Sequence, residues 1–288
     1  MSDLRGICVP ICTPMTGDGA VDYAAFERNM DSLIQDGVHI IAVNGGTGEF
    51  PFLSEDEKRR LAELAVRRAD GRAKVIVQTS AIRTEDAVEN ARHAEGIGAD
   101  ALLVLPPYFE GPGEAGVRWH YEQIARAVKT PIMVYNIPVY TQFDITPEIF
   151  ARFSEIDGIA YIKDSTADPT RIEKLAGQGA KVFCGCDFLN FFALVSGAAG
   201  LFTGSGNVAP GLLRQLWDLT ASSRYGEAER VWRRLQPISR LLWTLPFNPV
   251  AKAGSQLTGR PAGLCRMPVP PLSAEEWRRV EEAVAALG

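Results

Sequence analysis

The feature that most constrains how this chain can fold is a series of short apolar segments rich in β-branched residues. Most of them are separated by a segment of helical periodicity. Continuous apolar strands that alternate with amphipathic helices are typical of a parallel sheet covered by helices. The predicted strands are residues 7–11, 39–43, 74–78, 101–105, 131–135, 159–163, 181–184 and 200–203.

Helix-start signals lie between these strands. Asp22 precedes apolar residues at helical spacing, and Ser54 with Glu57 has the pattern of a capping box. After the last predicted strand the periodicity stays helical to the end of the chain, where Ser273 and Glu276 are expected to cap a final helix. Strands and helices therefore alternate first, and helices alone follow.

This order predicts an α/β fold, a (β/α)8 TIM barrel with a C-terminal helical extension. We expect residues 1–222 to form the barrel with the catalytic site, and residues 223–288 to form a helical appendage behind it. A doubly wound open sheet is the alternative, because the spacing of the later strands permits closure without requiring it.

Composition excludes several classes of function. The 288 residues are 46% hydrophobic and 23% charged, which fits one large domain with a substantial core. The net charge of -5 comes from interspersed charges, so nucleic acid is not an expected partner. Neither a membrane span nor a signal peptide is predicted. We expect a cytoplasmic protein whose five cysteines are free, since they are too few for a disulfide framework.

In a βα barrel, functional residues lie just past the carboxyl ends of the strands. Lys163 is the most informative of them, because it ends an apolar run and its side chain would lie inside the barrel or at its rim. An amine must be neutral to attack a carbonyl group, and burial favours the neutral form. The alternative is a lysine paired with Asp164 or with another carboxylate.

Two further strand ends offer groups that suit the same chemistry. Tyr135 ends the fifth predicted strand, where its hydroxyl is placed to move protons; a tyrosine that only packs its ring is the alternative. Thr47 lies among Gly45, Gly46 and Gly48, whose backbone N–H groups suit a substrate carboxylate. Alone, such a segment is more often an ordinary turn, and it lacks the spacing of a nucleotide-binding loop.

The cysteines and histidines give weaker indications. Cys184 and Cys186 raise the alternative of a thiol oxidoreductase, but without a second Cys or His cluster they make a poor zinc site. His93 and His120 fall in helical segments, where we expect them on the surface. No metal site is predicted.

Several motifs occur together along the chain: Thr13-Pro14 with Gly19 and Val21-Asp22, Gly46-Thr47-Gly48-Glu49, Pro107-Tyr108, Tyr135-Asn136-Ile137-Pro138, Ile162-Lys163-Asp164, and Asn248-Pro249 with Lys252. In this combination the chain resembles the dihydrodipicolinate synthase and N-acetylneuraminate lyase family of Schiff-base-forming class I aldolases. The resemblance covers nearly the full length, and the combination is far more specific than any single motif.

The resemblance implies that Lys163 forms an imine with a 2-oxo acid of the pyruvate type, that Tyr135 relays protons, and that Thr47 helps to bind the carboxylate. No metal or organic cofactor is needed, because the protonated imine accepts the electrons. The family also implies a homotetramer, a dimer of dimers. Further residues expected to bind substrate are Gly46, Gly48, Tyr108, Ser165, Asp187, Ser205 and Asn207.

Departures from the family's lysine-pathway synthases affect the expected substrate. Those enzymes usually have two adjacent hydroxyl residues where this chain has Gly46-Thr47, and a second tyrosine where Phe109 falls. They also carry an arginine after the Tyr-Asn-x-Pro motif, whereas residues 139–141 offer no cation. We therefore expect aldol cleavage or dehydration of a 2-oxo-3-deoxy (sugar) acid. The alternatives are 4-hydroxy-tetrahydrodipicolinate synthase, which joins pyruvate and aspartate semialdehyde, and a non-catalytic sugar-acid-binding barrel.

Overall fold

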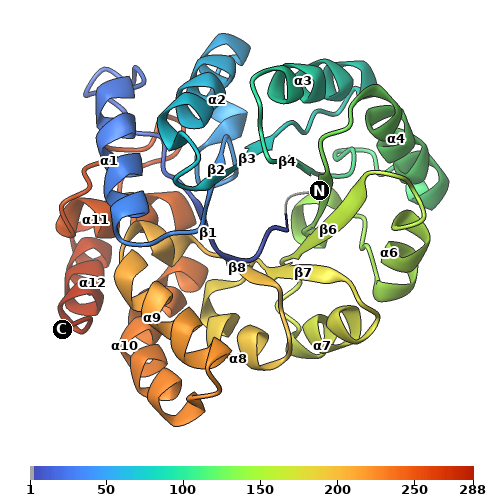
Figure 1. Cartoon of the computed structure of the whole chain (residues 1–288). Helices are drawn as coiled ribbons and strands as arrows, with labels where there is room; N and C mark the ends of the chain where they lie inside the picture. Colours follow the sequence, from blue (N-terminus) through green and yellow to red (C-terminus); the bar gives the residue numbers. More distant parts are fainter. Residues whose placement is uncertain (1–2) are drawn as a thin grey trace.

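The computed structural model describes residues 3–288 and is built around a closed barrel of eight parallel strands in sequence order (Figure 1). Each strand pairs with the next along the chain, and the last strand pairs with the first. Closure confirms the TIM barrel and excludes the open sheet. The strands are β1 (Gly6–Pro10), β2 (Ile40–Val43), β3 (Lys74–Gln78), β4 (Ala101–Val104), β5 (Ile132–Asn136), β6 (Ile159–Asp164), β7 (Lys181–Cys184) and β8 (Gly200–Phe202).

The strands lie between two apolar environments, which explains their continuous apolar sequences. Side chains such as Cys8, Ile76 and Phe183 point into the barrel and form an interior cluster. Their neighbours in the chain, such as Val9 and Val77, face the surrounding helices and belong to a larger outer cluster. A strand that is buried on both faces is apolar at almost every position.

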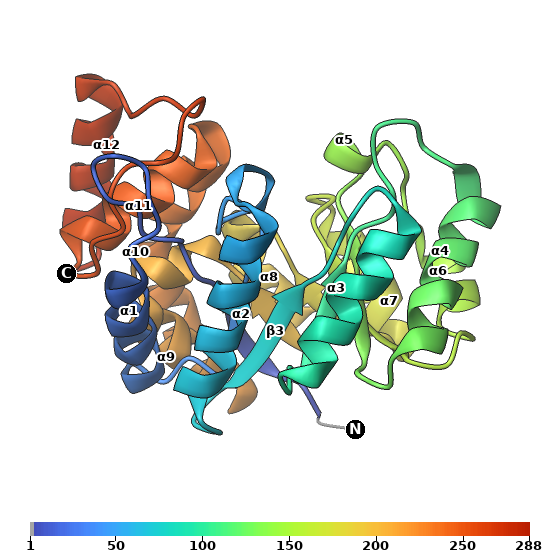
Figure 2. The same cartoon turned by 90° about the horizontal axis from the view of Figure 1, so that it is seen from above.

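Helices surround the barrel, and α5, which follows β5, lies at the end of the barrel where the strands finish (Figure 2). The helices are α1 (Tyr23–Gln35), α2 (Glu55–Ala69), α3 (Thr84–Gly96), α4 (Gly113–Ala127), α5 (Pro138–Thr141), α6 (Pro147–Phe153), α7 (Pro169–Gly177), α8 (Asn190–Val195), α9 (Pro210–Ala221), α10 (Tyr225–Thr244), α11 (Phe247–Leu257) and α12 (Ala274–Ala285). Short 3₁₀ turns are η1 (Phe50–Phe52), η2 (Asp187–Leu189) and η3 (Gly204–Asn207).

The predicted helix starts are confirmed by their capping hydrogen bonds. The carboxylate of Asp22 accepts from the backbone of α1, at 2.8 Å. Ser54 with Glu57 forms the predicted capping box at α2, and Ser273 with Glu276 forms the same arrangement at α12. Each cap satisfies backbone N–H groups that the first turn of a helix leaves without an intrahelical partner.

The C-terminal helices lie on the side of the barrel that carries α1 and α9 (Figures 1 and 2). Leu235 and Ile238 of α10 and Val250 of α11 are fully buried and belong to the same outer cluster as the barrel strands. Asn29 of α1 donates to the carbonyl of Pro261 at 2.9 Å. The extension is therefore packed against the barrel. Among residues 3–288, no helix has the length and apolarity required to cross a membrane.

The expected surface position of His120 is wrong. Its side chain is 1% exposed and lies on the inner face of α4 with Val117, Tyr121 and Ile124. Its Nδ1 is 2.9 Å from Thr84 Oγ1. Burial lowers the pKa of His120 to about 4. The spacing of these four positions places them on one helical face, so the histidine is a buried core residue of α4.

Candidate active site

Lys163 lies on β6 with its side chain inside the mouth of the barrel. The residue is 6% exposed. Its Nζ is 3.7 Å from the ring centroid of Tyr135 and 4.0 Å from that of Phe202. Tyr135 is also the register partner of Lys163 across the β5–β6 pairing. Closure of the barrel therefore brings together the amine and the phenol that the sequence singled out.

Asp164, the predicted alternative partner of Lys163, faces away from it. Strand side chains alternate, so adjacent residues of β6 lie on opposite faces. The Asp164 carboxylate accepts from Asn136 Nδ2 at 2.9 Å and from Thr166 Oγ1 at 2.6 Å. Burial raises the pKa of Asp164, although these hydrogen bonds act in the opposite direction. Within residues 3–288, Lys163 forms no ion pair with any carboxylate.

Asn136 ties the end of β5 to the end of β6. Its Nδ2 also donates to Asp144 Oδ1 at 3.0 Å, and its Oδ1 accepts from the backbone of Ile145 at 2.9 Å. Asp144 in turn forms a two-pronged ion pair with Arg171, at 2.6 and 2.9 Å. This network fixes the two strand ends that carry Tyr135 and Lys163.

The turn of residues 45–48, which we call the β2 turn, presents free backbone donors. Two of its carbonyl groups accept hydrogen bonds from side chains outside the turn: Thr13 Oγ1 donates to Gly48 O at 2.7 Å, and Asn248 Nδ2 donates to Gly46 O at 3.0 Å. The N–H groups of its last three residues donate to no other atom of residues 3–288. Fixed carbonyls and free N–H groups suit a carboxylate ligand.

Three of the other predicted site residues lie at strand ends around this mouth. Thr47, in the β2 turn, is 6% exposed. Ser165 follows β6 and is equally buried, and its Oγ has no hydrogen-bond partner among residues 3–288. Tyr108 follows β4 and is half-buried; burial, with a smaller effect of Glu55, raises the pKa of its phenol. Their contact with substrate stays a prediction.

Asp187, Ser205 and Asn207 use their polar atoms within the chain. Asp187 Oδ1 accepts from the backbone of Ser205 at 2.6 Å and from Thr203 Oγ1 at 2.6 Å. Asn207 accepts from the backbone of Cys12 at 3.0 Å and donates to the carbonyl of Pro10 at 2.9 Å. These contacts join the ends of β7, β8 and β1. Substrate binding by these residues stays a prediction.

Gly185 makes room for the side chain of Lys163. A Cβ atom at this position would lie 2.1 Å from Ser165 Oγ and 2.9 Å from Lys163 Cε. Such distances are far below van der Waals contact. In the sequence, Gly185 is only the residue between Cys184 and Cys186, and no local pattern indicates that it faces β6.

The thiols on either side of Gly185 are buried and free. Cys184 and Cys186 are each 1% exposed. Burial raises the pKa of Cys186 to about 12 and raises the pKa of Cys184 well above its usual value. A buried protonated thiol is a poor nucleophile and redox group. The described part of the chain also has no cluster of three His, Cys, Asp or Glu side chains arranged to hold a metal ion.

Comparison with known proteins decides the family. The model of the dihydrodipicolinate synthetase family matches residues 3–287. The chain belongs to this family. It is therefore an enzyme of the class I aldolase type, a Schiff-base lyase, as the combined motifs implied.

Individual relatives of the family agree over almost the whole chain. The 4-hydroxy-tetrahydrodipicolinate synthase of Parvibaculum lavamentivorans is 34% identical over 287 residues, which cover 99% of this chain and 98% of the relative. The solved structure of a dihydrodipicolinate synthase from Bacillus anthracis has a TM-score of 0.95 at 27% identity, and covers 100% of both chains. That of a chloride-inhibited dihydrodipicolinate synthase from Acinetobacter baumannii, complexed with pyruvate, has a TM-score of 0.93 at 29% identity, with 99% of each chain covered.

Proposed function

We propose that Lys163 forms an imine with the 2-oxo group of a pyruvate-type acid. The observation that carries this proposal is the position of Lys163 Nζ in the barrel mouth, against the rings of Tyr135 and Phe202 and outside any ion pair within residues 3–288. An amine that lies in the mouth and is not engaged by a carboxylate within residues 3–288 is placed to attack a bound carbonyl group.

The chemical steps follow from this arrangement. Lys163 Nζ adds to C2 of the acid, the carbonyl oxygen takes up a proton, and water leaves as the C=N bond forms. The Tyr135 hydroxyl donates and accepts the protons of these steps, as general acid and base. The chemistry requires no metal and no organic cofactor, because the protonated imine itself withdraws electrons from the neighbouring carbon atoms.

We place the substrate carboxylate at the β2 turn. Support comes from its free backbone N–H groups and from Thr47, whose hydroxyl lies among them. The turn lies across the barrel from β6, since β2 and β6 are four strands apart in the closed order. A 2-oxo acid bound between them would present C2 to Lys163 and its carboxylate to Thr47 and Gly48.

The mouth favours a hydroxylated 2-oxo-3-deoxy acid as the substrate. Cations near the strand ends are already paired within the chain: Lys58 with Glu55 at 2.7 Å, and Arg171 with Asp144. Within residues 3–288, neither Lys58 nor Arg171 is therefore free to bind a second carboxylate. We therefore propose either aldol cleavage, in which the C3–C4 bond breaks and the imine becomes an enamine, or dehydration, in which a C3 proton and the C4 hydroxyl leave as water.

A second candidate is 4-hydroxy-tetrahydrodipicolinate synthase, which joins pyruvate and aspartate semialdehyde. The name of the Parvibaculum relative supports this reaction. The comparisons support the synthase more directly than they support cleavage or dehydration, whereas the residues of the mouth favour the latter. Both reactions begin with the same imine, so the second substrate decides between them.

Trapping of the imine tests the shared step. The protein is incubated with pyruvate and borohydride, which reduces an imine irreversibly, and the adduct is located by intact-mass and peptide analysis. We expect one adduct on Lys163, none in Lys163→Ala, and an adduct in Tyr135→Phe that forms 10²–10⁴ times more slowly, in keeping with a lost proton-transfer group. Activity with pyruvate plus aspartate semialdehyde would establish the synthase, and cleavage or dehydration of oxo sugar acids would establish the leading proposal.

A wild-type protein that forms no adduct with pyruvate or with larger 2-oxo acids would contradict the proposal. Such a result would favour the non-catalytic sugar-acid-binding barrel. The proposal includes a homotetramer and a cytoplasmic location, both taken from the resemblance and the composition. Sedimentation at several concentrations tests the first, with a species four times the 31.4 kDa mass of the chain as the expected result.

A further inference from the structure

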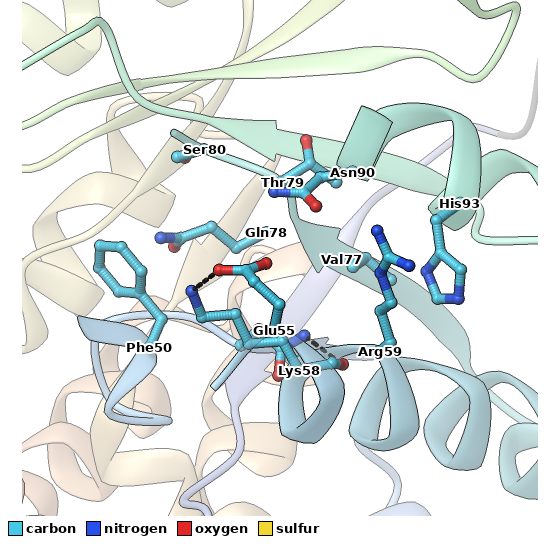
Figure 3. A pocket seen from close by; sticks show the side chains of 11 residues that line it. Phe50, Glu55, Lys58, Arg59, Val77, Gln78, Thr79, Ser80, Asn90 and His93 are labelled. Atoms are coloured by element: carbon cyan, nitrogen blue, oxygen red, sulfur yellow. Dashed lines mark hydrogen bonds and ion pairs between the residues drawn. The ribbon is translucent and has the colours of Figure 1, made fainter. Parts of the chain in front are cut away.

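Gln78, the last residue of β3, has a buried side chain that is left without hydrogen bonds. The residue is 7% exposed, and neither Oε1 nor Nε2 has a partner among residues 3–288. In Figure 3 the side chain extends toward Phe50, and no dashed contact reaches it. Burial of an amide without partners is unfavourable, and native structures contain few such groups, so each calls for an explanation such as a functional role.

The amide of Gln78 belongs to the interior of the barrel mouth. Ile76, two residues earlier on β3, is part of the interior cluster, and side chains at positions i and i+2 of a strand share a face. A Cβ atom on Gly45 would lie 3.8 Å from Gln78 Oε1 and 3.8 Å from Pro10 Cβ. Gln78 therefore lies next to the β2 turn, where we place the substrate carboxylate.

Gln78 also borders a shallow cleft between α2 and α3. Lys58 and Glu55, two of the charged residues that line this cleft, are paired with each other (Figure 3). Adjacent side chains of an extended strand point to opposite faces of the sheet, so Thr79, the next residue, is directed to the outer face. The strand register thus assigns the amide of Gln78 to the mouth.

The chemistry of an amide limits what can satisfy it. A carboxylate only accepts hydrogen bonds and an ammonium group only donates them, whereas a side-chain amide offers one acceptor and two donors. A hydroxyl group both donates and accepts. We propose that Gln78 binds a hydroxyl group on the chain of the substrate and thereby selects hydroxylated 2-oxo acids over unsubstituted ones. This inference rests on the proposed imine chemistry, which places the substrate in this mouth.

Imine formation with matched acids tests the role of Gln78. The readout is the apparent dissociation constant, from borohydride trapping on Lys163 at rising concentrations of pyruvate, 2-oxopentanoate and 4-hydroxy-2-oxopentanoate. The last two acids differ by one hydroxyl group. We expect the wild type to bind 4-hydroxy-2-oxopentanoate at least about tenfold more tightly than 2-oxopentanoate, because a site built to hydrogen-bond a hydroxyl group discriminates against the analogue without it.

Gln78→Met retains the length of the side chain without its hydrogen bonds, and Gln78→Leu is a second apolar variant. We expect both to lose the tenfold preference and to bind pyruvate like the wild type, which also shows that they are folded. Gln178→Met is the matched control, because Gln178 is exposed at the end of α7; it should keep the preference.

Two results would overturn the inference while leaving the proposed function intact. One is a wild type that traps pyruvate on Lys163 but shows no preference for the hydroxylated acid. The other is a preference that persists in both apolar variants, which would mean that another group binds the hydroxyl. A wild type without any adduct on Lys163 would instead refute the proposed function, and this inference with it.

Discussion

Gly185 determines how much room the side chain of Lys163 has. Alanine at this position would place a Cβ atom 2.1 Å from Ser165 Oγ and 2.9 Å from Lys163 Cε, so at least one of the two must move. We predict that Gly185→Ala slows borohydride trapping of the pyruvate imine by tenfold or more, because displacement of a nucleophile by a fraction of an ångström disrupts its alignment with the carbonyl group. Quenched time points analysed by mass spectrometry give the rate.

Gly177→Ala is the control for this substitution. Gly177 lies at the end of α7, and a Cβ atom there would have no heavy atom within 4 Å. Its trapping rate should equal that of the wild type. An unchanged trapping rate in Gly185→Ala would contradict the prediction, and would show that the loop after β7 shifts to accommodate the methyl group without moving Lys163.

Helix α11 holds the β2 turn through a buried ion pair. Lys252 Nζ lies 2.5 Å from Glu49 Oε1, directly after the turn, and both side chains are at most 2% exposed. Lys252→Met leaves a buried carboxylate without its partner, which typically costs about 3–5 kcal/mol. We predict a loss of that size in the free energy of unfolding. We also predict a raised KM for the 2-oxo acid, because the β2 turn, where we propose that the carboxylate binds, is no longer fixed. Urea titrations and steady-state kinetics measure the two effects.

Arg278→Met on α12 is the matched control, since its ion pair with Glu282 is 62% exposed on both sides. Exposed pairs contribute about 0–1 kcal/mol, so its stability and KM should stay near the wild-type values. The double variant Glu49→Gln with Lys252→Met should recover part of the lost stability, because the unpaired charge is gone. If Lys252→Met loses stability but keeps the wild-type KM, the ion pair contributes to folding and not to binding of the 2-oxo acid.

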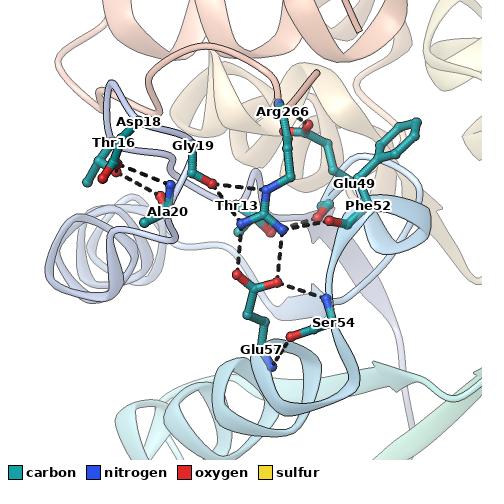
Figure 4. A network of polar contacts seen from close by, with 11 residues as sticks. Thr13, Thr16, Asp18, Gly19, Ala20, Glu49, Phe52, Ser54, Glu57 and Arg266 are labelled. Atoms are coloured by element: carbon teal, nitrogen blue, oxygen red, sulfur yellow. Dashed lines mark hydrogen bonds and ion pairs between the residues drawn. The ribbon is translucent and has the colours of Figure 1, made fainter. Parts of the chain in front are cut away.

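Arg266 connects three distant parts of the molecule (Figure 4). It donates to the carbonyls of Gly19 and Phe52, at 2.7 and 2.6 Å, and pairs with Glu57 on α2 at 2.7 Å. The hydrogen bond from Arg266 lowers the pKa of Glu57 to about 2, from its usual 4.5. The depressed pKa means that this pair stabilises the fold above about pH 4.5, and that the contribution is lost as the pH falls toward 2.

We predict that the free energy of unfolding of the wild type falls by about 2–3 kcal/mol more than that of Glu57→Gln between pH 4.5 and pH 2. Urea unfolding at a series of pH values measures the difference. Glu173→Gln, an exposed substitution on α7, should follow the wild type. Parallel curves for wild type and Glu57→Gln would contradict the assigned role of the Arg266 contact.

Local patterns in the sequence determined the elements of this fold. The eight strands and the capped helices follow from apolar runs and from side chains that bond to the backbone within three residues, and such signals need no distant partner. The place of Lys163 and Tyr135 at neighbouring strand ends followed from the same patterns once a barrel was assumed. His120 was misplaced, although its helical spacing with buried neighbours contained the necessary signal.

Only the tertiary structure decided which side chains face one another. Gln78 near Gly45, Gly185 against Lys163, and Lys252 beside Glu49 are contacts between elements far apart in the sequence. Each depends on closure of the barrel and on strand register, since a shift of one residue would turn every side chain of a strand to the other face. The sequence thus determined the elements and the placement of Lys163 and Tyr135 at neighbouring strand ends. Packing between the elements decided the space around Lys163, the contacts that fix the β2 turn, and the burial of the Gln78 amide without a partner among residues 3–288.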